Sequence, residues 1–270
     1  MKIFCSSNVQ DCLRFCDPVH VSIAEDLLAI EKNLSYTLNS LKFEIPVCYV
    51  YNPLEYASIL HSMFVRKYCN STKKVLFLGM NPGPWGMSQT GVPFGEISVV
   101  RDWLELDAPV GRPQREHPQR PVTGLACHRS EPSGRRFWGL LRKICPSAIS
   151  ALADAAVYNH CPISLLSESG RNITPAELKS KQLEPLLRPC DSALVSVLKL
   201  LQVNIIVSIG KYAEARAKAI LRVNEELKQK ISVVYLPHPS PRNLAIKDWE
   251  KTALEILQNS GIASILVGTV

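Results

Sequence analysis

The sequence lacks a long apolar run. Its unbroken hydrophobic stretches, such as Val75 to Leu78, are far shorter than the roughly 18 residues that a membrane span requires. The segment from Met1 to Gln10 carries a single lysine and no long apolar stretch, so we expect neither a secretory signal nor a membrane partner. Hydrophobic residues make up 46% and charged residues 20% of the 270 positions, which excludes a collagen, a coiled coil and a wholly disordered chain.

The sequence also lacks a C-x-x-C pair, although it contains nine cysteines between Cys5 and Cys190. An odd number of scattered cysteines argues against a disulfide-stapled secreted domain and favours reduced thiols in an intracellular protein. The nearest approach to a metal-ligand pattern is Cys12, Cys16 and His20, which has no fourth ligand in a recognisable pair. We therefore predict no metal ion, no iron–sulfur cluster and no other cofactor.

Several sequence motifs for nucleotide and base chemistry are absent as well. The chain has no Gly-Lys-Ser/Thr phosphate loop, no Gly-x-Gly-x-x-Gly fingerprint, and none of the His-x-Glu and Pro-Cys-x-x-Cys elements of a zinc deaminase. No compact basic cluster resembles a nuclear import signal. A net charge of +7 suggests a polyanionic partner such as nucleic acid without proving one.

The sequence does contain alternating helical and strand patterns. Apolar residues at helical spacing predict helices over 22–41, 56–68, 99–106, 137–144, 174–201, 212–227 and 248–257. Short apolar runs predict buried strands over 74–80, 155–159, 203–210 and 231–236, with loops over 79–95 and 107–134. This alternation predicts the α/β class with a mostly parallel sheet. We expect a single domain over residues 21–270, preceded by a poorly ordered extension over residues 1–20.

Three of the four predicted strands run into conspicuous polar segments. These segments are Met80-Asn-Pro-Gly-Pro, Tyr158-Asn-His-Cys-Pro and His238-Pro-Ser-Pro-Arg-Asn. In an open parallel sheet, ligands bind beyond the carboxyl ends of the strands, so segments that are far apart in sequence meet at one edge. The sequence therefore predicts a site there.

The polar segments offer four side chains with distinct chemistry. Asn81 would place a neutral amide in the crevice, and Phe94, between Pro93 and Gly95, suits an aromatic platform or ordinary core packing. The amide of Asn159 offers both a donor and an acceptor, which matches the N3–H and O4 edge of uracil and not the opposite pattern of cytosine. His238 lies in a turn stiffened by prolines, although a lone histidine is more often structural than catalytic.

These motifs resemble the single-strand-selective monofunctional uracil-DNA glycosylase family of the uracil-DNA glycosylase superfamily. The resemblance is carried by Gly-Met-Asn-Pro-Gly-Pro-Trp-Gly-Met-Ser-Gln-Thr-Gly-Val-Pro-Phe-Gly (79–95) and His-Pro-Ser-Pro-Arg-Asn (238–243), and it is supported by the stretches 51–56, 100–104 and 169–178. It implies the three-layer fold of that superfamily, with a four-stranded sheet flanked by helices. It also implies a monofunctional enzyme that releases uracil and 5-oxidised uracils, 5-hydroxymethyluracil and 5-formyluracil, from single- and double-stranded DNA and leaves an abasic site.

The resemblance further implies a role for each matching residue. Asn81 corresponds to the residue that positions water, and His238 to the catalytic histidine near uracil O2. Substrate contacts are implied for Met80, Gly83, Phe94 and Asn159, of which Met80 and Gly83 line the pocket near the 5-position of the base. The segment implied to enter the duplex comprises Pro239, Ser240, Pro241, Arg242 and Asn243. We expect the basic loop from Arg112 to Arg136 to contact DNA as well.

One residue departs from the family pattern, and other functions stay open. His160 follows Asn159, which the resemblance implies to contact the base, at a position where we expect an apolar residue.

The main alternative function is that of a non-catalytic relative of the same fold that binds damaged or single-stranded DNA. A Cys–His hydrolase built on His160 and Cys161 is disfavoured, because adjacent residues of an extended strand face opposite sides. The family also leads us to expect a monomer located in the nucleus, acting in base-excision repair.

Overall fold

The structure is a computed structural model that describes residues 22–241 and 247–268. Several sequence predictions lie outside these residues: the N-terminal extension over 1–20, the spacing of Cys12, Cys16 and His20, and the expected DNA contacts of Arg242 and Asn243.

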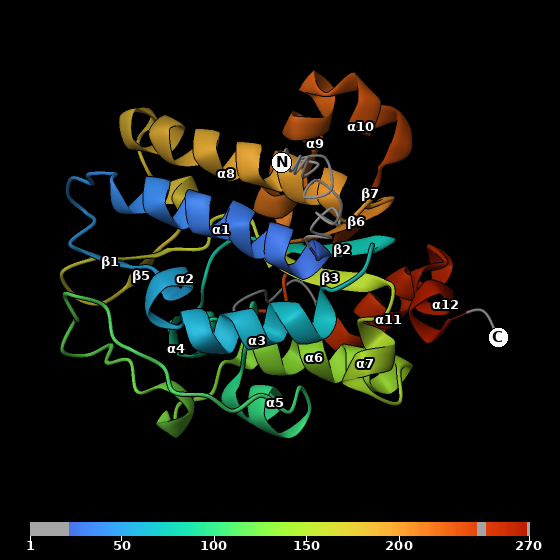
Figure 1. The fold of residues 1–270 in the computed structure, drawn as a ribbon, viewed down its shortest axis with the longest axis horizontal. Helices are drawn as coiled ribbons and strands as arrows, with labels where there is room; N and C mark the ends of the chain where they lie inside the picture. Colours follow the sequence, from blue (N-terminus) through green and yellow to red (C-terminus); the bar gives the residue numbers. More distant parts are fainter. Residues whose placement is uncertain (1–21, 242–246, 269–270) are drawn as a thin grey trace, which may run out of the picture.

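A parallel sheet of four strands lies at the centre of the fold (Figure 1). Its strands are β2 (Val75–Gly79), β3 (Ala155–Asn159), β6 (Ile205–Ile209) and β7 (Ser232–Leu236), arranged in space as β3-β2-β6-β7. Every residue of β2 and β3 is buried, which explains why both strands are continuous apolar runs in the sequence. The predicted α/β class and the four predicted strands are confirmed.

Two helical layers cover the sheet, above and below it in Figure 1. The upper layer contains α1 (Ile23–Asn39), α8 (Ser180–Leu200), α9 (Lys211–Val223) and α10 (Glu225–Lys230). The lower layer contains α6 (Pro132–Ile144), α7 (Ala148–Ala151), α11 (Trp249–Asn259) and α12 (Ile262–Val267). Two further helices, α2 (Pro53–Tyr56) and α3 (Ser58–Tyr68), pack against α1. None of the helices in the described part of the chain is long and apolar enough to cross a membrane.

The order of the strands creates a crevice at one end of the sheet. The chain leaves β2 for β3 on one side and then crosses from β3 to β6 on the other side of β2. Such a reversal opens a gap beyond the carboxyl ends of the strands, which is where open α/β sheets bind ligands. The polar segments that follow β2, β3 and β7 all begin at this end.

A second, antiparallel sheet was not predicted from the sequence. It consists of β1 (Tyr49–Tyr51), β4 (Ser164–Leu166) and β5 (Asn172–Ile173), in the order β1-β4-β5. Its strands have only two or three residues, too few for an alternating pattern. The hydroxyl of Tyr51 accepts from the backbone N–H of His117 at 2.7 Å and donates to the Arg120 carbonyl at 2.8 Å, which fixes the long loop against this sheet.

Some predicted boundaries were wrong. The loop over 79–95 contains the single helical turn α4 (Met87–Thr90), and α5 (Ile97–Asp102) begins before residue 99 because Glu96 caps it. The helix expected over 174–201 is interrupted: a 3₁₀ turn at Pro175–Glu177 carries a capping box formed by Thr174 and Glu177, and α8 begins only at Ser180. The loop over 107–134 contains another 3₁₀ turn at Gly124–Ala126, and α6 begins within it at Pro132.

A buried ion pair anchors the loop that follows β2. His61 of α3 lies with Nε2 2.7 Å from Glu31 of α1 and Nδ1 2.8 Å from the carbonyl oxygen of Gly91. Burial lowers the pKa of His61, but the charge of Glu31 and the two hydrogen bonds outweigh it and raise the pKa overall. With both ring nitrogens facing acceptors, the imidazolium form ties α1, α3 and the loop together.

Candidate functional site

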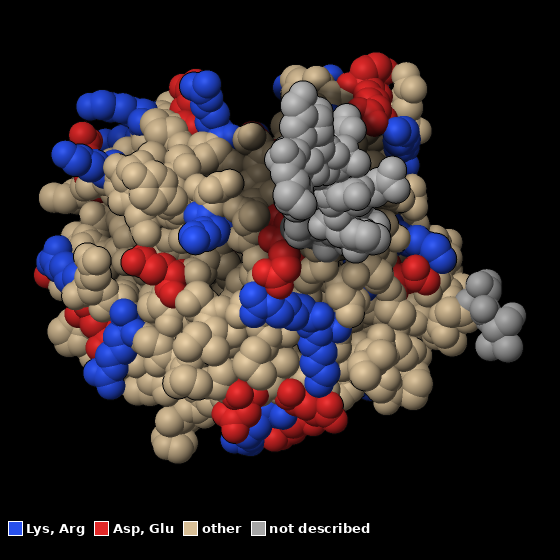
Figure 2. Space-filling view, in the orientation of Figure 1, with Lys and Arg blue, Asp and Glu red and all other residues tan. Residues whose placement is uncertain are grey.

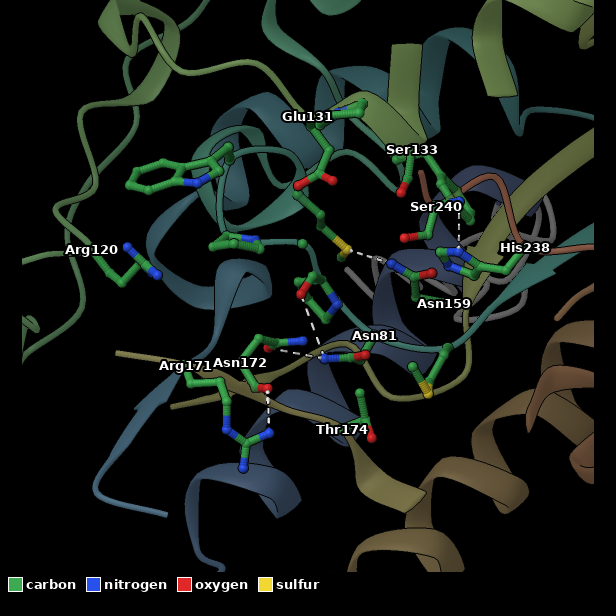
Figure 3. A pocket seen from close by; sticks show the side chains of 18 of the residues that line it. Asn81, Arg120, Glu131, Ser133, Asn159, Arg171, Asn172, Thr174, His238 and Ser240 are labelled. Carbon is green, nitrogen blue, oxygen red and sulfur yellow. Dashed lines mark hydrogen bonds between the residues drawn. The ribbon is translucent and has the colours of Figure 1, made fainter. Parts of the chain in front are cut away.

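A cavity of about 590 Å³ opens at the carboxyl end of the parallel sheet (Figure 3). Its lining comes from the ends of β2, β3, β7 and the small sheet, and from the first turn of α6: Met80, Asn81, Pro82, Gly83, Pro84, Trp85, Met87, Phe94, Arg120, Glu131, Pro132, Ser133, Asn159, Ser169, Arg171, Asn172, Thr174, Glu177, His238, Ser240 and Pro241. The predicted convergence of the three polar segments is therefore found in the structure.

His238 lies in a turn that is fixed from several sides. Trp249 Nε1 donates to the carbonyl of Pro237 at 2.8 Å, and Arg136 donates to the carbonyl of Pro239 at 3.2 Å. The backbone N–H of Ser240 donates to His238 Nδ1 at 3.1 Å. Burial lowers the pKa of the His238 imidazole, which favours the neutral ring. Because Nδ1 accepts, the neutral ring carries its proton on Nε2, where it serves as a hydrogen-bond donor.

Asn159 ends β3 and is 4% exposed. Its amide nitrogen donates to the sulfur of Met87 at 3.1 Å, and its amide oxygen has no hydrogen-bond partner among the described residues. A thioether is a weak acceptor, so neither half of this buried amide is well paired. Gly79 lies beside it in register, and any Cβ there would overlap the amide oxygen. The amide is positioned for a ligand that presents a donor and an acceptor side by side.

Phe94 lines the cavity and is held by its backbone as well as by packing. Its φ of 55° is rare for a bulky residue, and its carbonyl oxygen accepts from Trp138 Nε1 at 3.0 Å. The ring lies 4.8 Å from that of Phe137, centroid to centroid. Gly134 makes this arrangement possible, because a Cβ there would overlap the Phe94 carbonyl oxygen. Both predictions for Phe94 therefore apply, because the residue packs on the core and also presents a fixed aromatic surface to the cavity.

Asn81 is oriented by a residue that sequence reasoning did not single out. Its amide nitrogen lies 3.5 Å from Oδ1 of Asn172, on β5, and 3.5 Å from the carbonyl oxygen of Pro82. Both contacts use the nitrogen, so they direct the amide oxygen away from Asn172 (Figure 3). The antiparallel sheet thereby contributes to the site as well as to the fold.

Glu131 is a second residue that the sequence did not reveal. It precedes α6, and its Oε2 is buried with no hydrogen-bond partner in the described part of the chain. A Cβ on Gly83 would overlap this carboxyl group, so the predicted site residue Gly83 makes room for it. Burial raises the pKa of Glu131 against the opposing effect of the Trp85 and Ser133 backbone N–H groups.

Arginines surround one side of the cavity mouth. The Trp85 ring has the guanidinium carbons of Arg120 and Arg129 at 5.2 and 4.7 Å from its centroid. Arg171 pairs with Glu177, which also accepts from the backbone N–H of Thr174 at 2.8 Å. These contacts place fixed positive charge at the rim.

Other parts of the expected basic surface lie elsewhere. Arg112 and Arg115 line a separate cavity of about 550 Å³, where Arg115 stacks 4.5 Å from the ring centroid of Tyr49. On the face drawn in Figure 2, basic and acidic side chains of the described residues are interspersed. Ser240 and Pro241 line the main cavity, whereas Pro239 contributes its carbonyl to the contact with Arg136.

His160 faces away from the cavity. Its side chain is completely buried, with Nε2 2.8 Å from Asp191 and Nδ1 3.0 Å from the hydroxyl of Tyr212. Burial lowers its pKa, and Asp191 is also paired with Arg216. Neither His160 nor Cys161 lines the cavity, which removes the structural basis for a Cys–His hydrolase.

Comparison with known proteins agrees with this architecture. The family model described as the uracil DNA glycosylase superfamily matches residues 66–258. The chain is 50% identical over 246 residues to a protein of Bos taurus named single-strand selective monofunctional uracil DNA glycosylase, with 91% of this chain and 89% of the relative covered. A Mus musculus protein of the same name is 48% identical over 250 residues, with 92% and 88% covered.

A solved structure supports the fold independently. The crystal structure of wild-type Pedobacter heparinus SMUG2 superposes with a TM-score of 0.60 and covers 90% of this chain and 99% of that chain. The two sequences are 14% identical, so this likeness shows a shared fold.

Proposed function

The chain belongs to the uracil DNA glycosylase superfamily, and from this premise we propose how its cavity releases a base from DNA and which bases it accepts. The enzyme is a monofunctional uracil DNA glycosylase, a hydrolase of N-glycosyl bonds that acts in DNA repair. Its overall reaction breaks the bond between C1′ of the deoxyribose and N1 of the base, adds the hydroxyl group of water to C1′ and the proton to the released base, and leaves an abasic site.

The under-paired amide of Asn159 carries the proposal. Uracil presents N3–H and O4 side by side, and the Asn159 oxygen and nitrogen complement them as acceptor and donor. Cytosine presents a lone pair at N3 and an amino group at C4, so the fixed amide would leave groups unpaired on both partners. Such mismatches cost about 1–3 kcal/mol each when buried. Phe94 supplies the stacking surface for the planar ring.

His238 would stabilise the departing base. Cleavage of the glycosidic bond leaves negative charge on the uracil ring, much of it on O2, and an oxocarbenium-like sugar. A neutral imidazole that carries its proton on Nε2 can donate to O2 as this charge develops. The donor is fixed before the reaction by the Ser240 N–H, so little reorganisation is needed at the moment of cleavage.

Asn81 would hold the water that attacks C1′. A neutral amide accepts a proton poorly near pH 7, so Asn81 orients the water and does not act as a general base. No lysine is among the described residues that line the cavity. A Schiff base with C1′ would need an amine nucleophile, so this lining supports base release without strand cleavage.

The accepted bases include uracils oxidised at the 5-position. Gly83 and Met80 line the cavity, and the Glu131 carboxyl occupies the place that a side chain on Gly83 would take, so the acceptance of 5-hydroxymethyluracil and 5-formyluracil in addition to uracil rests on the family resemblance. The base must leave the stack to enter the cavity, which costs a few kcal/mol in duplex and less in single strands. We propose that both kinds of DNA are substrates, that residues 239–243 enter the space left by the base, and that the enzyme works as a monomer in the nucleus.

A glycosylase assay tests this function. Labelled single- and double-stranded oligonucleotides carrying uracil or 5-hydroxymethyluracil are incubated with the wild-type protein, Asn81→Ala and His238→Ala, and products are scored with and without alkali. We expect the wild-type protein to release the base and the strand to break only after alkali treatment. The rate of base release should fall by at least about a hundredfold in both variants. Salt-dependent DNA binding without base release would instead identify a non-catalytic DNA-binding relative.

A further inference from the structure

The lining of the cavity defines which edge of the base each residue faces. If Asn159 pairs with N3–H and O4, and His238 Nε2 with O2, the C5 edge of the ring lies on the side of Asn159 opposite His238. His238 packs against Gly210 at the end of β6, whereas Glu131 packs against Gly83 and Gly86 after β2. In Figure 3, Glu131 and His238 lie on opposite sides of Asn159. The residue on the C5 side is therefore Glu131.

One of the two carboxyl oxygens of Glu131 lacks a hydrogen-bond partner among the described residues, although the Trp85 and Ser133 backbone N–H groups lie beside the carboxyl group. Its Oε2 is buried without a hydrogen-bond partner in the residues that the structure describes, which carries a desolvation cost. A hydrogen-bond donor on the substrate would relieve this cost.

The backbone around Glu131 is shaped to admit its carboxyl group. A Cβ on Gly83 would overlap the carboxyl oxygen, and a Cβ on Gly86 would lie 2.9 Å from Glu131 Cγ. Pro132 occupies the first position of α6 and fixes the chain immediately after Glu131. The two glycines thus leave space for the Glu131 carboxyl group at the wall of the cavity, and the proline restricts the backbone next to it.

We propose that Glu131 determines which 5-substituents the enzyme accepts, with its Oε2 accepting a hydrogen bond from the hydroxyl of a 5-hydroxymethyl group. This inference rests on the proposed function and adds a residue that reads the C5 edge. The methyl group of thymine offers no donor and would be pressed against the unpaired oxygen. The formyl group of 5-formyluracil offers only an acceptor, so it gains nothing from Glu131. The carboxyl group thereby favours the hydroxymethyl base over both.

The test compares single-turnover excision of uracil, 5-hydroxymethyluracil and 5-formyluracil by the wild-type protein, Glu131→Leu and Glu131→Gln. Leu removes the acceptor at similar volume, and the ratio of 5-hydroxymethyluracil to uracil rates should fall by about tenfold or more. Gln keeps one accepting oxygen and adds a donor, so the ratio of 5-formyluracil to 5-hydroxymethyluracil rates should rise by about threefold or more. Glu168→Gln serves as the control, because it removes one negative charge from an exposed side chain next to the cavity-lining Ser169.

The outcomes separate this inference from the function on which it rests. If the wild-type protein releases no uracil, the proposed function itself fails. If it releases uracil but both rate ratios are the same in the wild-type protein and the Glu131 variants, Glu131 does not read the 5-substituent. A parallel change of the ratios in Glu168→Gln would also overturn the assignment, by showing a general effect of charge. If Glu131→Leu fails to fold, the ratio of 5-formyluracil to 5-hydroxymethyluracil rates in Glu131→Gln decides the question alone.

Discussion

The backbone N–H of Ser240 donates to His238 Nδ1 at 3.1 Å, so the loop itself orients the imidazole. No carboxylate lies within hydrogen-bond distance of the ring among the described residues. The Nε2 proton is thus directed by a peptide group two residues further along the chain. The tautomer depends on the geometry of the loop.

Removing that peptide donor should impair catalysis. Ser240→Pro deletes the N–H, whereas Ser240→Ala keeps it and removes only the hydroxyl. We expect the single-turnover rate at saturating enzyme to fall by about tenfold or more in the proline variant relative to the alanine variant. Equal rates in the two variants would show that the Ser240 N–H does not orient His238.

The contact between Asn81 and Asn172 should contribute to the rate of hydrolysis. Asn172→Ala removes the oxygen that faces the Asn81 amide nitrogen, and we expect the excision rate to fall about threefold to tenfold, because a weakly held amide orients water less well. Asn172→Asp keeps an accepting oxygen and should lose less. The measurement is the single-turnover rate on a uracil oligonucleotide; a larger loss in the Asp variant would contradict the contact.

Filling Gly83 should select against 5-substituted bases. Any side chain there overlaps Glu131, so Gly83→Tyr must displace the carboxyl group and occupy the C5 side of the cavity. We expect excision of 5-hydroxymethyluracil to be abolished while part of the uracil activity is kept. The check is the rate on matched oligonucleotides that differ only at the 5-position, and equal loss on both would contradict the assignment of this side of the cavity.

The His61–Glu31 pair should make stability depend on pH. The folded pKa of His61 lies above its ordinary value of 6.5, so its contribution is complete below pH 6.5 and is lost as pH rises through the folded value. We expect His61→Gln to lower the free energy of unfolding by about 3 kcal/mol at pH 6, because a buried partner is left unpaired. Urea denaturation should show a smaller difference from the wild type at pH 9; a constant difference would contradict a charged pair.

His160 should matter for stability and not for the reaction. His160→Leu removes the hydrogen bonds to Asp191 and Tyr212 but leaves Asp191 paired with Arg216. We expect the free energy of unfolding to fall by about 1–3 kcal/mol, with the uracil excision rate within about twofold of wild type. Thermal denaturation and single-turnover kinetics measure the two effects. A tenfold loss of rate without loss of stability would show that His160 adjusts the position of Asn159.

The centre of the parallel sheet could be predicted because β2 and β3 are buried along their whole length. Val75 to Leu78 and the strand ending at Asn159 are apolar without interruption and are stopped by Gly, Pro or polar residues, a local signal that needs no tertiary information. The small sheet gives no such signal, since β4 and β5 have three and two residues. β4 pairs with β5 across a short turn, whereas its pairing with β1 joins segments that lie far apart in the sequence.

The same distinction applies to the site. Asn81 and His238 each follow a recognisable strand and Asn159 ends one, so the topology alone brings them to one edge. Glu131 lies in a long segment rich in Pro and Arg, where nothing local distinguishes it from an exposed carboxylate. Its importance arises only because Gly83 and Gly86, far from it in sequence, pack against it.

Helix α6 touches both ends of the cavity. Glu131 stands at its first turn beside the loop after β2, and Arg136, one turn further on, holds the carbonyl of Pro239 next to His238. The length of a helix barely changes, so α6 keeps these two walls of the cavity a fixed distance apart. A displacement of α6 along its axis would therefore move the Glu131 wall and the His238 loop together, so the two sides of the cavity change position as one unit.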